Sequence, residues 1–451
     1  MEEKEKSVQE NKMGVMPINR LLVSMSVPVM LSMLVQALYN IVDSVYVSRI
    51  SENALNAVGL AFPVQNLMIA VATGTGVGIN ALLSKSLGQK NFERANQAAV
   101  NGVFLAVCSY IVFALLGGLF SRQFFLIQTE VVEIVDGGTA YLQICTIASF
   151  GMFLQVTFER LLQSTGKTIY SMGTQMVGAV INIIFDPIFI FGLHMGVAGA
   201  AAATVMGQII ACIVSIIVNA AKNTEISVKM RGFRPDGAII KRIYAVGIPS
   251  ITMAAIGSVM TFGLNKILIS FTTTATAVFN VYFKLQSFVF MPIFGMNNGM
   301  VPIVAYNFGA KKPDRMLQTV KLGILYATSI MAIGFLVFQA LAGPLLRIFE
   351  ASENMLAIGI PALRIISIAF LFAGFCIVSS SFFQALGHGV LSLLISLVRQ
   401  LFVLLPAAWL LSLSGRLELI WFAFPIAEIV SVAMCVAFLR YVYRREIQPI
   451  L

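Results

Sequence analysis

The chain has 451 residues, of which 58% are hydrophobic and only 11% are charged. This composition excludes a soluble domain of this size and predicts an all-α polytopic membrane protein, since each spanning helix needs about 20 mostly apolar residues. The formal net charge of +10 does not require a nucleic-acid partner, and we expect none, because basic residues of membrane proteins collect on the cytoplasmic side.

The chain begins with a polar segment, residues 1–16, that lacks the apolar core and cleavage site of a signal peptide. We expect a flexible cytoplasmic tail here. The first hydrophobic stretch, Ser26–Arg49, carries an acid, Asp43, where a lipid-facing helix would carry Leu or Val. A carboxylate at membrane depth is energetically unfavourable, so Asp43 is a candidate functional residue. The alternative is that Asp43 caps the helix end near the membrane interface.

Asp43 belongs to a polar face of this first span. Gln36, Tyr39, Asn40 and Asp43 are spaced i, i+3, i+4 and i+7, which places them on one face of a helix. Pro28 precedes this face, removes a backbone hydrogen bond and can kink the span. The stretch therefore predicts a polar face next to a hinge at Pro28.

Hydropathy, punctuated by Gly, Pro and charged residues, predicts twelve spans, six on each side of a long basic connection. The expected limits of the spans are 21–48, 55–83, 95–118, 138–163, 168–191, 196–219, 243–270, 276–305, 316–342, 358–384, 389–412 and 419–441. The corresponding domains are an N-terminal tail at 1–16, a six-helix lobe at 17–220, a cytoplasmic linker at 221–241, a second six-helix lobe at 242–445 and a C-terminal tail at 446–451.

The basic residues indicate how the chain is oriented. Twenty of them lie in the termini and the even-numbered connections, whereas four lie in the odd-numbered connections. This bias predicts that both termini are cytoplasmic.

The two halves are related in sequence when the chain is slid along itself without gaps until Pro28 meets Pro249. At this repeat shift the loop LGQKNFERA at 87–95 meets FGAKKPDRM at 308–316. Because each half has an even number of spans, both halves keep the same orientation, which predicts a parallel repeat about an axis along the membrane normal. Further matched pairs are Gly74 with Gly295, Gly78 with Gly299, Gly88 with Gly309, Arg94 with Arg315, Gln163 with Gln384 and Gly166 with Gly387.

Orientation converts sequence position into depth, and four polar residues of the first half then share one layer near the external side. They are Asp43 in span 1, Asn182 and Asp186 in span 5, and Thr204 in span 6. Two acids with neutral oxygen neighbours can hold a proton or coordinate a small cation such as Na⁺. The alternative is a polar network that only holds the helices together.

The second half is chemically different, because the repeat mate of Asp43 is Leu264. Lys266 and Lys284 lie at similar depth to Glu428, and we expect Glu428 to pair with either lysine, as part of a cavity or as a structural salt bridge. Arg399 is expected to face the interior near mid-membrane, and Glu159 and Arg160 are expected to snorkel toward the cytoplasmic interface. The stretches Ser287–Met300, which includes Met291, and Gln65–Asn80 occupy matching places in the two repeats and are the candidates for lining an adaptable substrate cavity.

Seven segments together resemble the multidrug and toxic compound extrusion (MATE) family, most closely its MepA-like bacterial branch. They are YNIVDSVYVSR, ALNAVGLAFP, SLGQKNFERA, LQSTGKT, INIIFDPIFIFG, GAAAATVMGQ and YFKLQSFVFMPIFGMNNGMVPIVAYNFGAKK, and the resemblance extends from about Pro17 to Arg440. It implies two six-helix lobes in a V, alternating access driven by H⁺ or Na⁺, and a cation site formed by Gln36, Asp43, Asn182, Asp186 and Thr204.

The sequence departs from the members thought to couple Na⁺ through the C-terminal lobe. Those members have acids in spans 7, 8 and 10, whereas this chain has Asn265 and Lys266 in span 7, Lys284 in span 8 and no acid in span 10. The departure favours the N-terminal lobe as the cation site.

These observations predict a secondary-active exporter of amphipathic organic cations and dyes, monomeric, without an organic cofactor, in the bacterial inner membrane. The alternative is a flippase for lipids or lipid-linked oligosaccharides with a related two-lobe fold. An enzyme is not expected, because the sequence has no HExxH or GxSxG motif. The substrate cavity is expected to include Tyr39, Asn40, Lys266, Lys284, Met291, Arg399 and Glu428.

Overall fold

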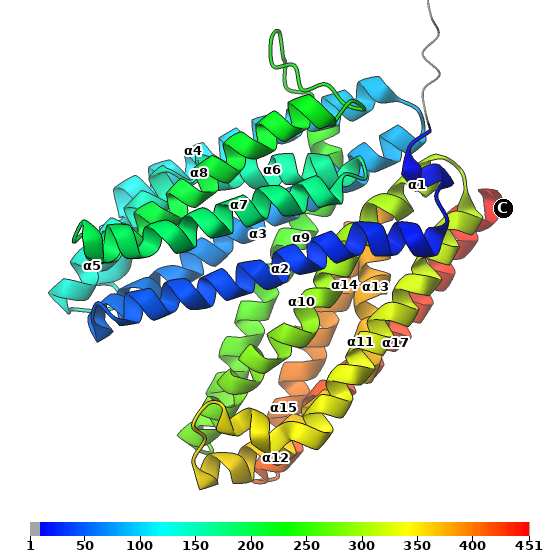
Figure 1. Ribbon diagram of the computed structural model, residues 1–451. Coiled ribbons are helices and arrows are strands. Elements are labelled where there is room, and N and C mark those ends of the chain that lie inside the picture. The colour runs from blue at the N-terminus through cyan, green and yellow to red at the C-terminus, as the bar shows by residue number, and fades with distance from the viewer. Residues whose placement is uncertain (1–9, 451) are drawn as a thin grey trace, which may run out of the picture.

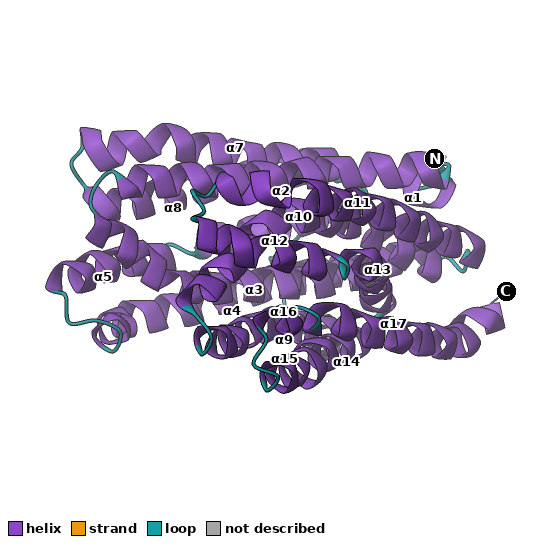
Figure 2. Ribbon diagram, turned by 90° about the horizontal axis from the view of Figure 1, so that it is seen from below, coloured by secondary structure: helices purple, strands orange, loops and turns teal. Residues whose placement is uncertain are grey.

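Every regular element that the structure describes is a helix (Figures 1 and 2). The computed structural model describes residues 10–450. The first half contains α1 (Lys12–Val15), α2 (Ile18–Ser48), α3 (Glu52–Gly88), α4 (Phe92–Leu126), α5 (Val132–Ile147), α6 (Phe150–Ser164), α7 (Thr168–Pro187), the π-helix η1 (Ile188–Gly192) and α8 (Gly196–Lys222). The second half contains α9 (Gly237–Ile269), α10 (Thr273–Gly309), α11 (Pro313–Arg347), α12 (Glu353–Ser367), α13 (Phe370–Leu386), α14 (Gly389–Leu397), the π-helix η2 (Val398–Leu404), α15 (Leu405–Ser412), α16 (Leu417–Ile420), α17 (Ala423–Val442), the π-helix η3 (Tyr443–Ile447) and the 3₁₀-helix η4 (Gln448–Ile450).

The helices reproduce the predicted fold class. Ten helical segments of the described chain are long and apolar enough to cross a membrane, and two bent pairs raise the number to twelve. The pairs are α5 with α6, bent by 44°, and α12 with α13, bent by 48°. The sequence analysis treated 138–163 and 358–384 as single spans and did not anticipate these bends. Neither break contains Gly or Pro, since the residues at the breaks are Ala148–Ser149 and Ile368–Ala369.

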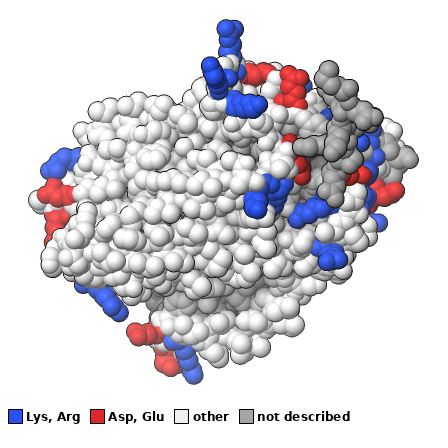
Figure 3. All heavy atoms as spheres, turned by 45° about the horizontal axis from the view of Figure 1, so that its top comes forward, with Lys and Arg blue, Asp and Glu red and all other residues white. Residues whose placement is uncertain are grey.

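A broad part of the surface carries almost no charge. Figure 3 shows this white band between rims where Lys, Arg, Asp and Glu gather. Large apolar side chains of the long helices, such as Leu119, Phe262 and Leu336, are more than 60% exposed. An apolar band between two charged rims is the surface that a lipid bilayer covers.

The internal repeat is visible in the backbone. Lys90 and Lys311, which are repeat mates, both adopt positive φ, at 56° and 54°. Gly166 and Gly387 do the same at 85° and 95°. The repeat extends to side chains, because Lys167 contacts Glu225 at 3.7 Å and the matching His388 contacts the matching Glu446 at 2.6 Å. The two halves therefore share turns and the position of a side-chain contact at the repeat shift found in the sequence.

The halves form two lobes arranged as the arms of a V (Figure 1). The lobes meet at the end where α1 and the end of α17 lie, which we call the terminus end, and diverge toward the opposite end. Glycines allow the close contact, because a Cβ on Gly78 would lie only 2.1 Å from the carbonyl oxygen of Ile243 in α9. The lobes are thus closed at the terminus end and separated at the other.

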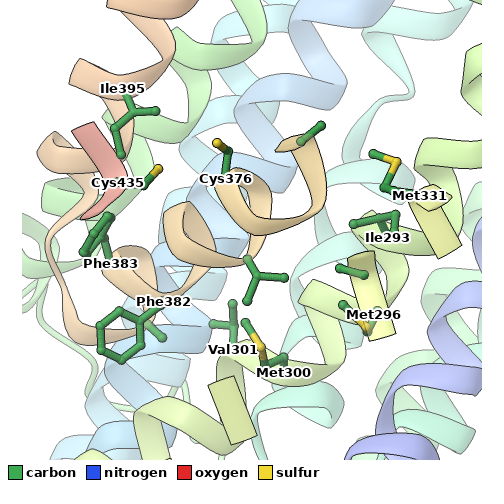
Figure 4. Close-up of a cluster of buried hydrophobic side chains, with 14 of the residues drawn as sticks. Ile293, Met296, Met300, Val301, Met331, Cys376, Phe382, Phe383, Ile395 and Cys435 are labelled. Atoms are coloured by element: carbon green, nitrogen blue, oxygen red, sulfur yellow. The ribbon is translucent and has the colours of Figure 1, made fainter. Parts of the chain in front are cut away.

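A core of apolar side chains fills the second lobe where α10, α11, α13 and α17 come together (Figure 4). Met296, Met300 and Phe383 are at most 2% exposed. In a soluble protein, full burial of such a side chain contributes about 1.5–3 kcal/mol to the free energy of folding. Within a membrane, close van der Waals packing of these side chains stabilises the association of the helices instead. This core keeps the second lobe a single packed body.

The N-terminal segment corrects one expectation. A flexible tail was expected up to residue 16, but residues 10–16 are folded against the body of the protein, and Met13 is fully buried. Asn11 caps α1 by accepting a hydrogen bond from the Met13 backbone N–H at 2.9 Å. The part of the expected tail at residues 1–9 lies outside the described residues.

Candidate ion and substrate site

The polar layer of the first lobe is assembled from α2, α7 and α8. Gly207 of α8 lies so close to α7 that a Cβ there would be 2.7 Å from the carbonyl oxygen of Gly178. This close approach brings Asn182 to Thr204. With its amide nitrogen facing Asp186, Asn182 donates to Asp186 Oδ2 at 3.3 Å and accepts from the hydroxyl and the backbone N–H of Thr204, both at 3.2 Å. The structure thus brings together three of the residues that the sequence placed at one depth.

Asp43 of α2 completes this layer. Its carboxyl group is close enough to that of Asp186 for the two acids to interact electrostatically. Asp186 is fully buried, and the Oδ1 atoms of both acids are buried without a hydrogen-bond partner among the described residues. Two carboxylates that share a site cannot both stay ionised without a partner charge. Such a pair can take up one positive charge, either as H⁺ or as a small cation held with the oxygens of Asn182 and Thr204.

A cavity of about 350 Å³ lies beside this layer. The acids Asp43 and Asp186 are not among its lining residues, but Asn182, which contacts Asp186, is one of them. Met291 comes from α10 of the second lobe, so the cavity has walls from both lobes. The lining residues that the sequence analysis had named as cation-site or cavity residues are Gln36, Tyr39, Asn40, Asn182, Thr204 and Met291.

The sequence analysis missed an acid in the cavity wall, Glu159 of α6. It expected Glu159 and Arg160 to snorkel to the interface, but they are only 3% and 9% exposed, so that expectation is wrong. Gln155 donates to Glu159 Oε1 at 2.9 Å and Gln175 donates to Oε2 at 2.8 Å. The sequence does contain a signal that could have indicated a buried acid, namely the three glutamines at 155, 163 and 175. Glutamine side chains can donate hydrogen bonds to a buried carboxylate that water does not reach.

Arg160 does not neutralise Glu159 directly. Its Nη1 donates to Gln163 Oε1 at 2.9 Å, and Gln163 in turn donates to Ser171 at 2.9 Å. Gly76 of α3 leaves room for the arginine stem, since a Cβ there would lie 2.7 Å from Arg160 Cγ. The cavity wall therefore holds one carboxylate and one guanidinium in separate hydrogen-bonded positions.

The charged residues named for the second lobe do not reach this cavity. Glu428 pairs with Arg399 at 3.1 Å, so the expected pairing of Glu428 with Lys266 or Lys284 is wrong. The two lysines are exposed, and their ammonium groups lie over the rings of Phe262 at 5.6 Å and Phe349 at 5.9 Å. Arg399 belongs to η2, and the wider π-helical turn displaces side chains from the register that an α-helix would give.

Pro28 lies inside α2, which runs unbroken from Ile18 to Ser48. The proline carbonyl oxygen accepts a hydrogen bond from the Ser32 hydroxyl at 2.9 Å. The role of Pro28 as a hinge stays a prediction.

The sequence matches the model of the MatE family over residues 28–188 and 249–410, which are the two repeats. The chain belongs to the MatE family. Among its relatives is the multidrug export protein MepA of Staphylococcus haemolyticus (strain JCSC1435), 27% identical over 424 residues that cover 94% of this chain and 93% of that protein. MepA of Staphylococcus aureus (strain MSSA476) is 23% identical over 407 residues, 90% of each chain.

Solved MATE structures have the same fold. One, described as the outward-facing conformation of a multidrug resistance MATE family transporter of the MOP superfamily, has a TM-score of 0.90, 25% identity, and covers 97% of this chain and 98% of its own. A MATE structure in the bent conformation also has a TM-score of 0.90 at 25% identity, covering 96% and 97%. This MatE protein is therefore a multi-pass membrane protein of a multidrug efflux transporter family.

Proposed function

We propose that this MatE protein exports amphipathic organic cations and dyes in exchange for H⁺ or Na⁺ by alternating access. The observation that carries the proposal is the pair of acids, Asp43 and Asp186, beside a cavity that both lobes line. The relatives described as multidrug export proteins support the substrate class.

In this mechanism the two acids are the coupling groups. When the pair binds H⁺ or Na⁺, the layer loses its excess negative charge, and Asn182 and Thr204 supply neutral oxygens for a metal cation. Since Asn182 contacts both Asp186 and the cavity, a change at the acids alters the cavity wall directly. Drug and coupling ion then disfavour each other's bound state, and this linkage is reciprocal.

Glu159 gives the cavity a reason to prefer cations. Its carboxylate is fixed by Gln155 and Gln175 and lies in the wall of the same cavity as Tyr39. A carboxylate in a low-dielectric site attracts an organic cation far more strongly than one in water, and the face of an aromatic ring adds cation–π attraction.

We also propose that the protein lies in the bacterial inner membrane as a monomer with both termini in the cytoplasm. The twenty-to-four bias of basic residues supports this orientation. The lobes, closed at the terminus end, would then be open toward the outside.

Transport into everted membrane vesicles tests the proposal. In Na⁺-free buffer with an acid interior, ethidium should collapse the pH gradient with the wild-type protein but not with Asp43→Asn or Asp186→Asn. Asp136→Asn is the matched control, because this exposed acid pairs with Arg122 at the surface, away from the cavity. If the two Asn variants transported ethidium at wild-type rates, the coupling role would be refuted.

The same assay separates the choice of ion and the alternative function. A response that appears only after Na⁺ is added assigns Na⁺ as the coupling ion. No ethidium transport under either gradient would favour the lipid flippase, although the second lobe offers that reading little support, because Arg399 is already neutralised by Glu428.

A further inference from the structure

Residues 10–16 form a strap across the terminus end of the molecule, where α1 lies between the lobes (Figure 1). Its backbone carbonyls are held by the corner between α10 and α11 in the second lobe. Asn307 donates to the Met13 carbonyl at 3.0 Å, and Arg315 donates to the carbonyls of Met13 and Met16 at 3.1 and 2.7 Å. This corner therefore satisfies backbone groups that a short helix leaves without partners.

Charge and packing reinforce the contact with the second lobe. Lys312 donates to the Gly14 carbonyl at 3.0 Å and to Glu10 at 2.5 Å. Gly14 packs closely against this corner, because a Cβ would lie 3.0 Å from the ring of Tyr306 and 2.9 Å from the Glu10 carboxylate. The strap is thus built into the corner rather than lying loosely on it.

The strap is also bound to the first lobe. The Asn11 side chain donates to the Thr165 carbonyl at 3.0 Å, in the turn between α6 and α7, and to Glu225 at 2.5 Å, in the connection that follows α8. Glu225 is itself paired with Lys167 of that turn at 3.7 Å. The strap continues through Met16 and Pro17 into α2, so covalently it belongs to the first lobe.

The repeat shows that this arrangement is specific to one corner. Arg94 is the repeat mate of Arg315 and occupies the equivalent corner of the first lobe. At the corner of the second lobe, Arg315 makes three polar contacts, two with the strap and one with Asn307 Oδ1 at 3.2 Å. The Nε of Arg94 is buried without a partner among the described residues. The planar, five-donor guanidinium of Arg315 is therefore used for binding the strap.

We propose that the strap is a latch that holds the lobes together at the terminus end and must release the α10–α11 corner whenever that end opens. The inference rests on the alternating access proposed above, in which the α10–α11 corner of the second lobe and the α6–α7 turn of the first lobe move apart. A segment of seven residues tied to both of these sites cannot keep both sets of bonds during that movement. The covalent link to α2 is short, so the bonds to the second lobe are the ones that break.

Electron paramagnetic resonance distances test the latch without relying on transport. Spin labels at Lys222 and Arg440, both exposed and on different lobes at the terminus end, report the separation there. Arg315→Gln should raise the ratio of the open to the closed population about tenfold, the effect of losing roughly 1.4 kcal/mol of charge-assisted hydrogen bonding. Arg94→Gln, the matched control, should leave the ratio unchanged. Equal shifts in both variants, or none in Arg315→Gln, would overturn the latch.

Reversible cross-linking gives a second test that a poorly folded variant cannot imitate. A thiol-reactive linker between cysteines replacing Glu10 and Lys312 should abolish opening and transport, and reduction should restore both. The same linker between cysteines replacing Asn11 and Thr165 ties the strap only to the first lobe and should leave both intact. Arrest by the second tether would show that the strap leaves the first lobe instead, against the proposal. If the distances respond as expected while no dye is transported, the latch stands and the proposed function fails.

Discussion

Gly88 in α3 and its repeat mate Gly309 in α10 mark a point where the backbones of the two lobes approach each other closely. A Cβ on Gly88 would lie 2.0 Å from the carbonyl oxygen of Tyr306, and a Cβ on Gly309 would lie 2.2 Å from that of Lys85. Lys85 and Tyr306 are also repeat mates, so the crossing is symmetric. The obstacle in each case is backbone, which cannot rotate away as a side chain would.

Gly88→Ala is therefore expected to weaken the closed state. An ordinary contact begins near 3.4 Å, so the helices would have to separate by about 1.4 Å at this crossing. Overpacking of this kind costs about 1–3 kcal/mol. Because the strain exists only while the terminus end is closed, the ratio of open to closed molecules should rise by about 5- to 150-fold.

The distance between spin labels at Lys222 and Arg440 measures this shift directly. Gly59→Ala is the control on the same helix, since a Cβ at Gly59 meets nothing within 4 Å, and it should leave the distances unchanged. A Gly88→Ala protein with the wild-type distance distribution and wild-type transport would refute the claim that a Cβ at this crossing strains the closed state.

Three further outcomes are expected. Arg399→Gln leaves Glu428 buried without its cation and should lower stability by about 3–5 kcal/mol, seen as a lower melting temperature, whereas Gln at both positions should lose less. Glu159→Gln should weaken binding of cationic dyes at least about tenfold by fluorescence titration while sparing neutral compounds. The hydrogen bond and the charge of Lys312 lower the pKa of Glu10 below 4.5. The Glu10–Lys312 contact should therefore stabilise strap docking fully above pH 4.5, and this stabilisation should be lost as the pH falls through the lowered pKa. Protease protection of the strap measures the change.

Much of the fold could be predicted from sequence because its signals are local or periodic. Apolar length marks the spans, and the repeat shift predicts turns that the structure repeats at Lys90 and Lys311. The polar layer could be predicted because span direction and the spacing of Asn182 and Asp186 fix their depth. The depth of these residues does not depend on which helices contact one another.

The residues that were misplaced depend on partners distant in the chain. Glu159 is close to the terminus end in depth, where snorkelling is the ordinary outcome, and its burial depends on Gln175 from the next helix. The partner of Glu428 was chosen among lysines at similar depth, but η2 turns Arg399 toward it. Depth in the membrane alone therefore does not identify which side chains, on different faces of packed helices, contact one another.

The two lobes share a backbone fold, but they differ in how they are expected to respond to binding of H⁺ or Na⁺. In the second lobe, Leu264 replaces Asp43, and Glu428 is already paired with Arg399, so an added proton or Na⁺ gains little there. In the first lobe, two acids share a site without a partner cation among the described residues. The response to a coupling ion is therefore expected to arise in the first lobe.

Helix α2 connects that response to the terminus end. Asp43 lies near one end of α2, and the strap joins its other end through Pro17. The stretch of α2 from Ile18 to Asp43 corresponds to about 40 Å of helix, with Pro28 within it. A bend or rotation of α2 caused by charge at Asp43 would therefore reach the strap through one continuous element. Labels that report strap release should then respond to Asp43→Asn, and a release equilibrium indifferent to that substitution would separate the latch from ion coupling.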